Sequence, residues 1–204
     1  LVVMHDDSVD RMTNGSGYIR EKTYAQLREL TVGTHERIPT LKEAIEAIGK
    51  SVKIAIELKG PGTAIPTARI IQEYIAKGWP TDHFYILSFD HIELYEFYKI
   101  IPQIKRCATI YGTMVGLSQY AQEYGFNAIA TSYEYATEKF VNDAHKHGLH
   151  VFVYTVNDPH IIKQLLFIGV DGIVSDYPDR VQTEVQFMQD TLIIGRTPFA
   201  QSGL

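Results

Sequence analysis

The chain has 204 residues, of which 45% are hydrophobic and 21% charged, and this is the composition of an ordinary globular domain. Its net charge is -5 and its lysines and arginines are scattered, so it offers no basic surface for nucleic acid or an anionic membrane. The single cysteine, Cys107, excludes an internal disulfide, and no apolar run approaches the roughly 18 residues of a membrane span. One domain over residues 1–204 is predicted, without stable membrane insertion and with a cytoplasmic location.

The chain opens on the apolar residues 1–4, which have the character of a strand, with neither an initiator methionine nor a signal peptide before them. Residues 2–19 predict a hairpin-like excursion around a turn at 14–17, and residues 1–20 are therefore assigned to a strand end and a hairpin insertion. Thr40 followed by Glu43 has the spacing of a capping box and predicts the start of a helix.

From residue 52 to residue 178, short β-branched runs alternate with longer segments of helical periodicity. The predicted strands are 52–58, 84–87, 105–110, 127–131, 150–156 and 172–175. The predicted helices are 64–77, 92–101, 116–124, 137–147 and 159–167. Local signals support them: a second capping box at Asp90 and Glu93, an N-cap at Asp158 before Pro159, and C-cap glycines at 148 and 169.

Residues 179–204 are predicted to be a C-terminal helix and tail. The tail carries an apolar patch at 192–194, which leaves docking on the rest of the chain, or on a second subunit of a homo-oligomer, open.

Six strands of βα type predict a (β/α)₈ TIM barrel with a small hairpin insertion. An open doubly wound sheet more often has a glycine-rich first turn, which is not visible here, but this fold stays an alternative. Because a (β/α)₈ barrel needs about 250 residues, one to two N-terminal βα units are expected to be absent from this chain.

Polar residues follow nearly every predicted strand, at the end where such barrels place their active sites. Glu57 stands in an apolar strand and needs a partner or a metal, and Lys59 points to the same side. The two are either a structural ion pair or a cation ligand beside a phosphate-neutralising ammonium. His5 precedes Asp6 and Asp7, so it is either a surface histidine or a catalytic imidazole oriented by a carboxylate.

Three further histidines, at 145, 147 and 150, invite a metal assignment. Two of them stand in the last predicted turn of a helix before Gly148, where cationic side chains complement the helix dipole. No His-Glu-x-x-His pattern accompanies them, so a structural role is the favoured interpretation.

Taken together, six blocks of this sequence resemble the glycerophosphodiester phosphodiesterases, and they follow one another in the order of that family. The first contains the His-Asp pair and a Gly-x-Gly insertion, and another is the Ile-Glu-Leu-Lys strand. The blocks are residues 2–17, 38–43, 56–59, 87–90, 154–157 and 169–178.

This resemblance implies a (β/α)₈ barrel and metal-dependent hydrolysis of glycerophosphodiesters to sn-glycerol 3-phosphate and an alcohol, by acid-base catalysis with a histidine pair. His5 resembles the second catalytic histidine, Glu57 a ligand of the divalent cation, and Lys59 a group that contacts the phosphate. Oxygen ligands favour Mg²⁺ or Ca²⁺. Tyr154 stands where the family usually has tryptophan, which implies a contact with the glycerol or head group of the substrate.

The family's His-Arg-Gly, Glu-Asn-Thr and Glu-x-Asp motifs have no counterpart in this sequence. The first catalytic histidine, an arginine and two acidic metal ligands are therefore expected upstream of residue 1, and the chain alone is expected to be inactive. Two alternatives stay open: a phospholipase D-like enzyme such as the venom sphingomyelinases, against which the single cysteine argues, and a non-catalytic barrel that binds a ligand.

Overall fold

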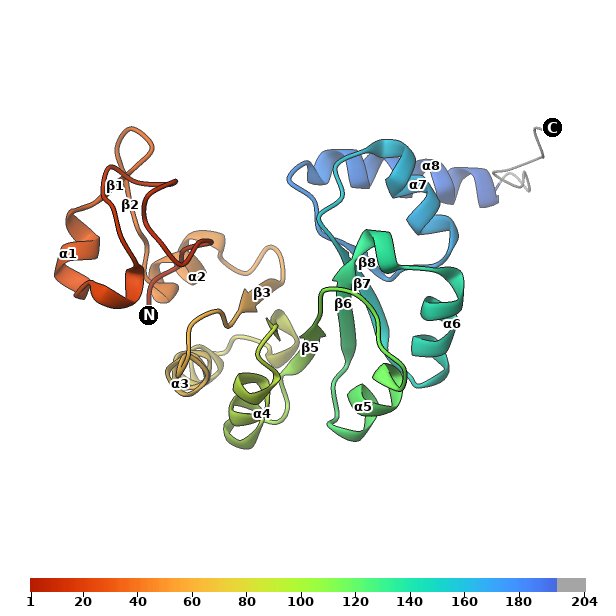
Figure 1. The fold of residues 1–204 in the computed structure, drawn as a ribbon, viewed down its shortest axis with the longest axis horizontal. Coiled ribbons are helices and arrows are strands. Elements are labelled where there is room, and N and C mark those ends of the chain that lie inside the picture. The colour runs from red at the N-terminus through yellow and green to blue at the C-terminus, as the bar shows by residue number, and fades with distance from the viewer. Residues whose placement is uncertain (194–204) are drawn as a thin grey trace. The chain divides into compact units, whose positions relative to one another are not determined.

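The computed structural model describes residues 1–193, which form two compact units that divide between Lys105 and Arg106 and are described separately (Figure 1). The second unit is described as far as Ile193. The predicted tail from residue 194 onward, including part of the apolar patch, lies outside the described residues.

The first unit contains a parallel βαβ arrangement preceded by shorter elements. Its helices are α1 (Tyr24–Glu29), α2 (Leu41–Ile48), α3 (Ala64–Ala76) and α4 (His91–Ile100). Its strands are β1 (Thr31–Val32), β2 (Glu36–Arg37), β3 (Ile54–Glu57) and β4 (Phe84–Ser88). β3 and β4 are parallel, with Ile54 opposite Phe84 and Glu57 opposite Leu87, so Glu57 lies at the carboxyl end of its strand.

The first forty residues form a small hydrophobic cluster of their own around the buried side chains of Val9, Leu27 and Ile38. The predicted hairpin-like excursion is present, since the Val9 N–H donates to the Gly17 carbonyl at 3.0 Å. Its turn is fastened to β1, because the Asn14 side chain accepts the Thr31 N–H at 2.8 Å. This pairing keeps the segment that carries His5 in a defined conformation.

The predicted capping box at the start of α2 is confirmed. The Thr40 hydroxyl accepts the Glu43 N–H at 3.1 Å, and the Glu43 carboxylate accepts the Thr40 N–H at 2.7 Å. α1 begins with a second box, from Thr23 and Gln26, which was not predicted. The first turn of a helix leaves N–H groups without an intrahelical partner. In each of these two short helices, the reciprocal bonds give two backbone N–H groups an acceptor.

The predicted box at the start of α4 is only half correct. Asp90 does cap the helix, accepting the N–H groups of Ile92 at 2.9 Å and Glu93 at 3.3 Å. The Glu93 carboxylate turns away from the Asp90 backbone and binds N–H groups at the start of α3 instead. A carboxylate in the first turn of α4 has the reach to cap the neighbouring helix, which local spacing does not reveal.

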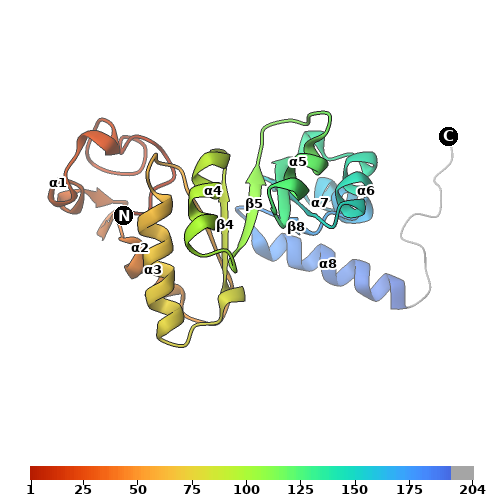
Figure 2. The same cartoon turned by 90° about the horizontal axis from the view of Figure 1, so that it is seen from below.

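α3 and α4 pack side by side in the first unit (Figure 2). The buried residues of α3 recur at helical spacing, and they are Ala64, Thr67, Ala68, Ile71 and Tyr74. At the far end of this helix, the Tyr74 ring meets Trp79 edge to face at 5.1 Å between centroids, and Trp79 stacks on Phe84 at 5.8 Å. This aromatic group ties the end of α3 to the start of β4, and burial raises the pKa of Tyr74 to about 12.

The second unit repeats the βα pattern with parallel strands throughout. Its strands are β5 (Lys105–Thr109), β6 (Ala128–Ser132), β7 (His150–Tyr154) and β8 (Gly172–Ile173). Its helices are α5 (Leu117–Glu123), α6 (Glu138–Lys146), α7 (Pro159–Phe167) and α8 (Pro178–Ile193). Every residue of β6 is buried, as expected for a parallel strand covered on both faces.

Most predicted boundaries of this unit agree with the structure. α7 has the predicted bounds, and Asp158 accepts the His160 N–H at 2.7 Å ahead of Pro159. Gly148 and Gly169 follow α6 and α7 with φ of 72° and 86°, the left-handed conformation that ends a helix and that favours glycine. Within residues 1–193, no helix is both long and apolar enough to cross a bilayer.

Candidate active site

Glu57 and Lys59 stand together at the carboxyl end of β3. Their side chains are 27% and 33% exposed, and the Lys59 Nζ lies 3.9 Å from the Glu57 Oε2. Leu58 between them is 2% exposed and points the other way, as the alternation of a strand requires. The prediction that the two charges lie on one side is therefore confirmed.

The Glu57–Lys59 separation is longer than the 2.7–2.9 Å of a charge-assisted hydrogen bond. The two groups attract one another without being locked together. Both keep the capacity to bind a further group, an anion at the ammonium and a cation or donor at the carboxylate. A closed structural salt bridge would have left neither available.

His5 lies in the first unit with its side chain 76% exposed, and its Nδ1 is 2.7 Å from the Asp6 Oδ1. Arg11 holds the same carboxylate, with its Nε 2.6 Å from Oδ2 and a terminal nitrogen 2.8 Å from Oδ1. The predicted orientation of His5 by a carboxylate is thus realised by Asp6. Asp7 contributes its backbone carbonyl to Ile19 at 2.9 Å.

The charge state of Asp6 decides the tautomer of His5. Hydrogen bonds from Arg11 and then from His5 hold the pKa of the Asp6 carboxyl well below its usual range, so Asp6 is ionised at neutral pH. An ionised carboxylate only accepts hydrogen bonds, which places the proton of a neutral His5 on Nδ1 and leaves Nε2 as a base. Arg11 belongs to the first sequence block, but nothing in the spacing indicated this partner.

Tyr154 ends β7 in the second unit and is half buried. Its hydroxyl donates to the Ile110 carbonyl at 2.6 Å, just after β5. The Thr131 hydroxyl donates to the Gly112 carbonyl at 2.7 Å, on the same segment. The two bonds anchor the loop that follows β5, and the Tyr154 hydroxyl is accordingly occupied by backbone.

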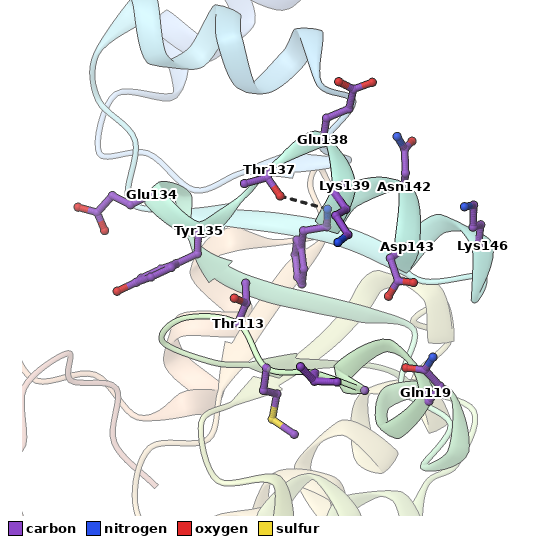
Figure 3. A pocket seen from close by; sticks show the side chains of 14 residues that line it. Thr113, Gln119, Glu134, Tyr135, Thr137, Glu138, Lys139, Asn142, Asp143 and Lys146 are labelled. Carbon is purple, nitrogen blue, oxygen red and sulfur yellow. Dashed lines mark hydrogen bonds between the residues drawn. The ribbon is translucent and has the colours of Figure 1, made fainter.

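A groove of about 1030 Å³ opens in the second unit beside the loops that follow β5 and β6 (Figure 3). It runs from Thr113 and Gln119 on one wall to Tyr135 and α6 on the other. None of the four predicted site residues lines it. Its walls are mixed, with Glu138 and Lys146 among the charged groups, so it has no single chemical character.

Polar residues after β7 and β8 form a connected network. The Asn157 amide donates to Asp176 at 2.8 Å, and its oxygen accepts the Ser175 hydroxyl at 3.0 Å. Arg180 donates to the Asn157 carbonyl at 2.9 Å. Asn157, Ser175 and Asp176 are among the polar residues that follow the predicted strands, and their hydrogen bonds connect the loops of two neighbouring strands.

The histidines at 145 and 150 lie near the opposite ends of the strands, around Asp171. The His145 Nε2 is 2.8 Å from the Asp171 Oδ2, and the His150 Nδ1 is 3.1 Å from Oδ1. Burial acts to raise the pKa of Asp171, but the Val151 N–H at 2.7 Å and the two imidazoles outweigh it and lower the pKa. This arrangement agrees with the structural role predicted for these histidines.

Asp171→Asn is expected to lower the free energy of unfolding by about 1–2 kcal/mol at pH 7, because a charged acceptor of three hydrogen bonds becomes neutral. The folded-state pKa of Asp171 is depressed, so its contribution is present above the unfolded pKa and is lost as the pH falls through the folded value. The difference in Tm between variant and parent should therefore shrink below about pH 4.

Asp143→Asn is the matched control, since Asp143 is 52% exposed and 4.0 Å from His147. It should change stability by less than about 0.5 kcal/mol. Equal effects of the two substitutions, or an Asp171→Asn effect that grows in acid, would contradict this assignment.

No group of three or more His, Cys, Asp or Glu side chains is placed to hold a metal ion within residues 1–193. A Mg²⁺ or Ca²⁺ shell needs six or more oxygen atoms, of which the Glu57 carboxylate could provide one or two. Glu57 therefore fits as one member of such a shell, and the described residues do not complete it.

Comparison with known proteins identifies the family. The model of the glycerophosphoryl diester phosphodiesterase family matches residues 1–180. A putative glycerophosphodiester phosphodiesterase of Bacillus subtilis, YhdW, is 30% identical over an alignment of 190 positions that covers 88% of this chain and 78% of that protein. A glycerophosphodiester phosphodiesterase of Caldanaerobacter subterraneus subsp. tengcongensis is also 30% identical, over 200 residues, covering 88% of this chain and 77% of that one.

Among solved structures, a phosphodiesterase of Oleispira antarctica, in complex with the product sn-glycerol 3-phosphate, superimposes with a TM-score of 0.82. It is 27% identical and covers 91% of this chain and 79% of its own. This likeness decides for the (β/α)₈ barrel and against the open sheet. The chain belongs to the glycerophosphoryl diester phosphodiesterase family, and it is an enzyme of the phosphoric diester hydrolase class.

Proposed function

We propose that the protein hydrolyses glycerophosphodiesters to sn-glycerol 3-phosphate and an alcohol, using a divalent cation and a pair of histidines that includes His5. The observation that carries the proposal is the Glu57–Lys59 pair, two opposite charges held 3.9 Å apart and open to further ligands. The product in the related Oleispira antarctica structure supports the choice of substrate.

Lys59 is the group for the phosphate. A phosphodiester is an anion that resists attack by nucleophiles, so a site must offset its charge before the phosphorus atom can react. The Lys59 ammonium, one third exposed at the end of β3, supplies a positive charge that an incoming phosphoryl oxygen can reach. The neighbouring Glu57 carboxylate, 3.9 Å away, lowers the positive potential around the ammonium without forming a close ion pair with it.

Glu57 is the one cation ligand proposed among the described residues. A divalent cation bound there would act as a Lewis acid that offsets charge on the phosphoryl oxygens. Hard carboxylate oxygen favours Mg²⁺ or Ca²⁺ over softer metals.

His5 is the general acid or base. Its Nδ1 is engaged with Asp6, so its Nε2 is the atom that exchanges a proton with an attacking or leaving oxygen. The Asp6 carboxylate stabilises the imidazolium that forms when His5 takes up a proton. Arg11 keeps that carboxylate ionised and fixed, which completes a chain from guanidinium to carboxylate to imidazole.

Tyr154 is proposed to contact the glycerol or head group of the substrate. Because its hydroxyl already donates to the Ile110 carbonyl, the contact would be made by the ring. A ring that is half buried and fixed at its far end offers an apolar face without the mobility of a long side chain.

Glu57→Gln is expected to weaken the affinity for the activating cation and to lower kcat/KM by roughly a hundredfold, because the loss of a charged ligand weakens divalent-cation binding. The assay is release of glycerol 3-phosphate from glycerophosphocholine by the full-length protein, titrated with Mg²⁺ and with Ca²⁺ after chelation.

Glu96→Gln is the control for this substitution, since Glu96 forms a surface pair with Lys99 at 2.6 Å on α4. Its kinetics and cation dependence should match the parent. An unchanged cation dependence in Glu57→Gln would remove Glu57 from the cation site. Cleavage of sphingomyelin in preference to glycerophosphocholine would favour the phospholipase D-like alternative.

A further inference from the structure

The backbone of the Glu57–Lys59 segment is held from the β4–α4 side. The Leu58 N–H donates to the Leu87 carbonyl at 2.8 Å, and the Leu58 carbonyl accepts the Ser88 hydroxyl at 2.5 Å. Ser88 is fully buried, so no water competes for this bond. Both polar groups of the residue between Glu57 and Lys59 are therefore satisfied by the neighbouring strand.

The turn that follows Lys59 is held by one carboxylate. Glu93, in the first turn of α4, accepts the Gly62 N–H at 2.6 Å with Oε1 and the Ala64 N–H at 2.7 Å with Oε2. These are short, charge-assisted bonds. The residue that should cap α3 itself, Thr63, has no side-chain cap bond. Glu93 thus provides from α4 the cap that α3 lacks.

The two N–H groups that Glu93 binds, at Gly62 and Ala64, are three and five residues after Lys59. The Thr63 hydroxyl and N–H both bond to the Gly60 carbonyl, at 2.7 and 3.3 Å, which closes the turn on itself. Gly62 has φ of +75°, so the turn has one well-defined and glycine-dependent shape. A displacement of Gly62 is consequently transmitted to Lys59, three residues earlier.

Lys59 depends on its backbone for position. Within residues 1–193 its ammonium pairs with Glu57 at 3.9 Å, a contact too long to fix a flexible four-carbon side chain. We propose that Glu93 is a positioning residue: by binding the N–H groups of Gly62 and Ala64, its carboxylate sets where the Lys59 ammonium stands relative to Glu57. This inference rests on the proposed function of Lys59.

A double-mutant cycle in the full-length protein tests it. Glu93→Ala is expected to lower kcat/KM for glycerophosphocholine about tenfold, since small misplacements of a site group are costly. In the Lys59→Ala background, the same substitution should change kcat/KM by less than about twofold, because the group that it misplaces is gone. Glu93→Gln keeps the length and one acceptor oxygen, but its NH2 group cannot accept the second N–H, so its kcat/KM should lie between those of the parent and Glu93→Ala.

Amide hydrogen exchange at Gly62 and Ala64 gives a readout that does not depend on activity. It should accelerate at both positions in Glu93→Ala and at one of them in Glu93→Gln, whose single amide oxygen can accept only one of the two N–H groups. If Glu93→Ala does not accumulate as folded protein, Glu93→Asp replaces it, because an acid one methylene shorter cannot reach both N–H groups.

Thr23→Ala is the matched control, since it removes the N-cap hydroxyl of α1 in the same unit. It should lower Tm comparably and leave kcat/KM unchanged. The proposal is overturned if Glu93→Ala lowers Tm without lowering kcat/KM, or if its effect simply multiplies that of Lys59→Ala. If Lys59→Ala itself has no effect, the proposed role of Lys59 fails and this proposal with it, whereas the exchange rates still report whether Glu93 holds the turn.

Discussion

His5→Ala is expected to lower kcat for glycerophosphocholine hydrolysis by roughly a hundredfold or more, the usual contribution of a general acid or base. In the proposed function the imidazole exchanges the proton, and Asp6, held by Arg11, orients it. The loss should appear in kcat and in kcat/KM alike, because the interaction belongs to the transition state.

The matched control is His35→Ala, which removes an exposed imidazole from the loop between β1 and β2 of the same unit. Its kinetics should equal those of the parent. Near-normal turnover in His5→Ala would refute the role of His5 and leave its contact with Asp6 as a surface ion pair.

Lys59→Ala is expected to lower kcat/KM about a hundredfold, with KM raised and kcat reduced, because the proposed role of the ammonium is to bind the phosphate of the substrate and to offset charge in the transition state. Glycerol 3-phosphate should bind more weakly as a product inhibitor for the same reason. Both effects are measured by steady-state kinetics with and without added product.

Lys53→Ala is the control for this change. Lys53 stands just before β3, at the opposite end of the strand from Lys59, and pairs with Asp82 at 3.2 Å on the surface. The two substitutions remove the same charge and the same side chain from the two ends of one strand. An unchanged kcat/KM in Lys59→Ala, or an equal loss in Lys53→Ala, would remove Lys59 from the site.

The elements of the fold were predictable where the determining interactions are local. β6 is a continuous buried run and α7 has its cap, its proline and its closing glycine within a dozen residues, so composition and spacing suffice. β1 and β2, of two residues each, were missed because nothing in so short a segment distinguishes a strand from a loop. Likewise, β7 ends at Tyr154, two residues before the predicted boundary.

The candidate site was predictable in its positions and not in its partners. The same-side placement of Glu57 and Lys59 follows from strand alternation, and the neighbour that orients His5 is adjacent in sequence. Glu93 has the spacing of a local cap, yet it binds groups about thirty residues earlier. The Tyr154 hydroxyl meets Ile110 from 44 residues away. Such contacts come from strand order, which residue spacing does not encode.

Cys107 on β5 is 1% exposed, and burial raises the pKa of its thiol. Because it is buried, it reacts with an alkylating reagent only when its surroundings open. It is the only sulfhydryl in the sequence, so the rate of alkylation measures the rate of that opening. A cysteine introduced at the fully exposed Val115 would accordingly be the single fast-reacting attachment point for a fluorophore or spin label. The native thiol would not have to be removed first.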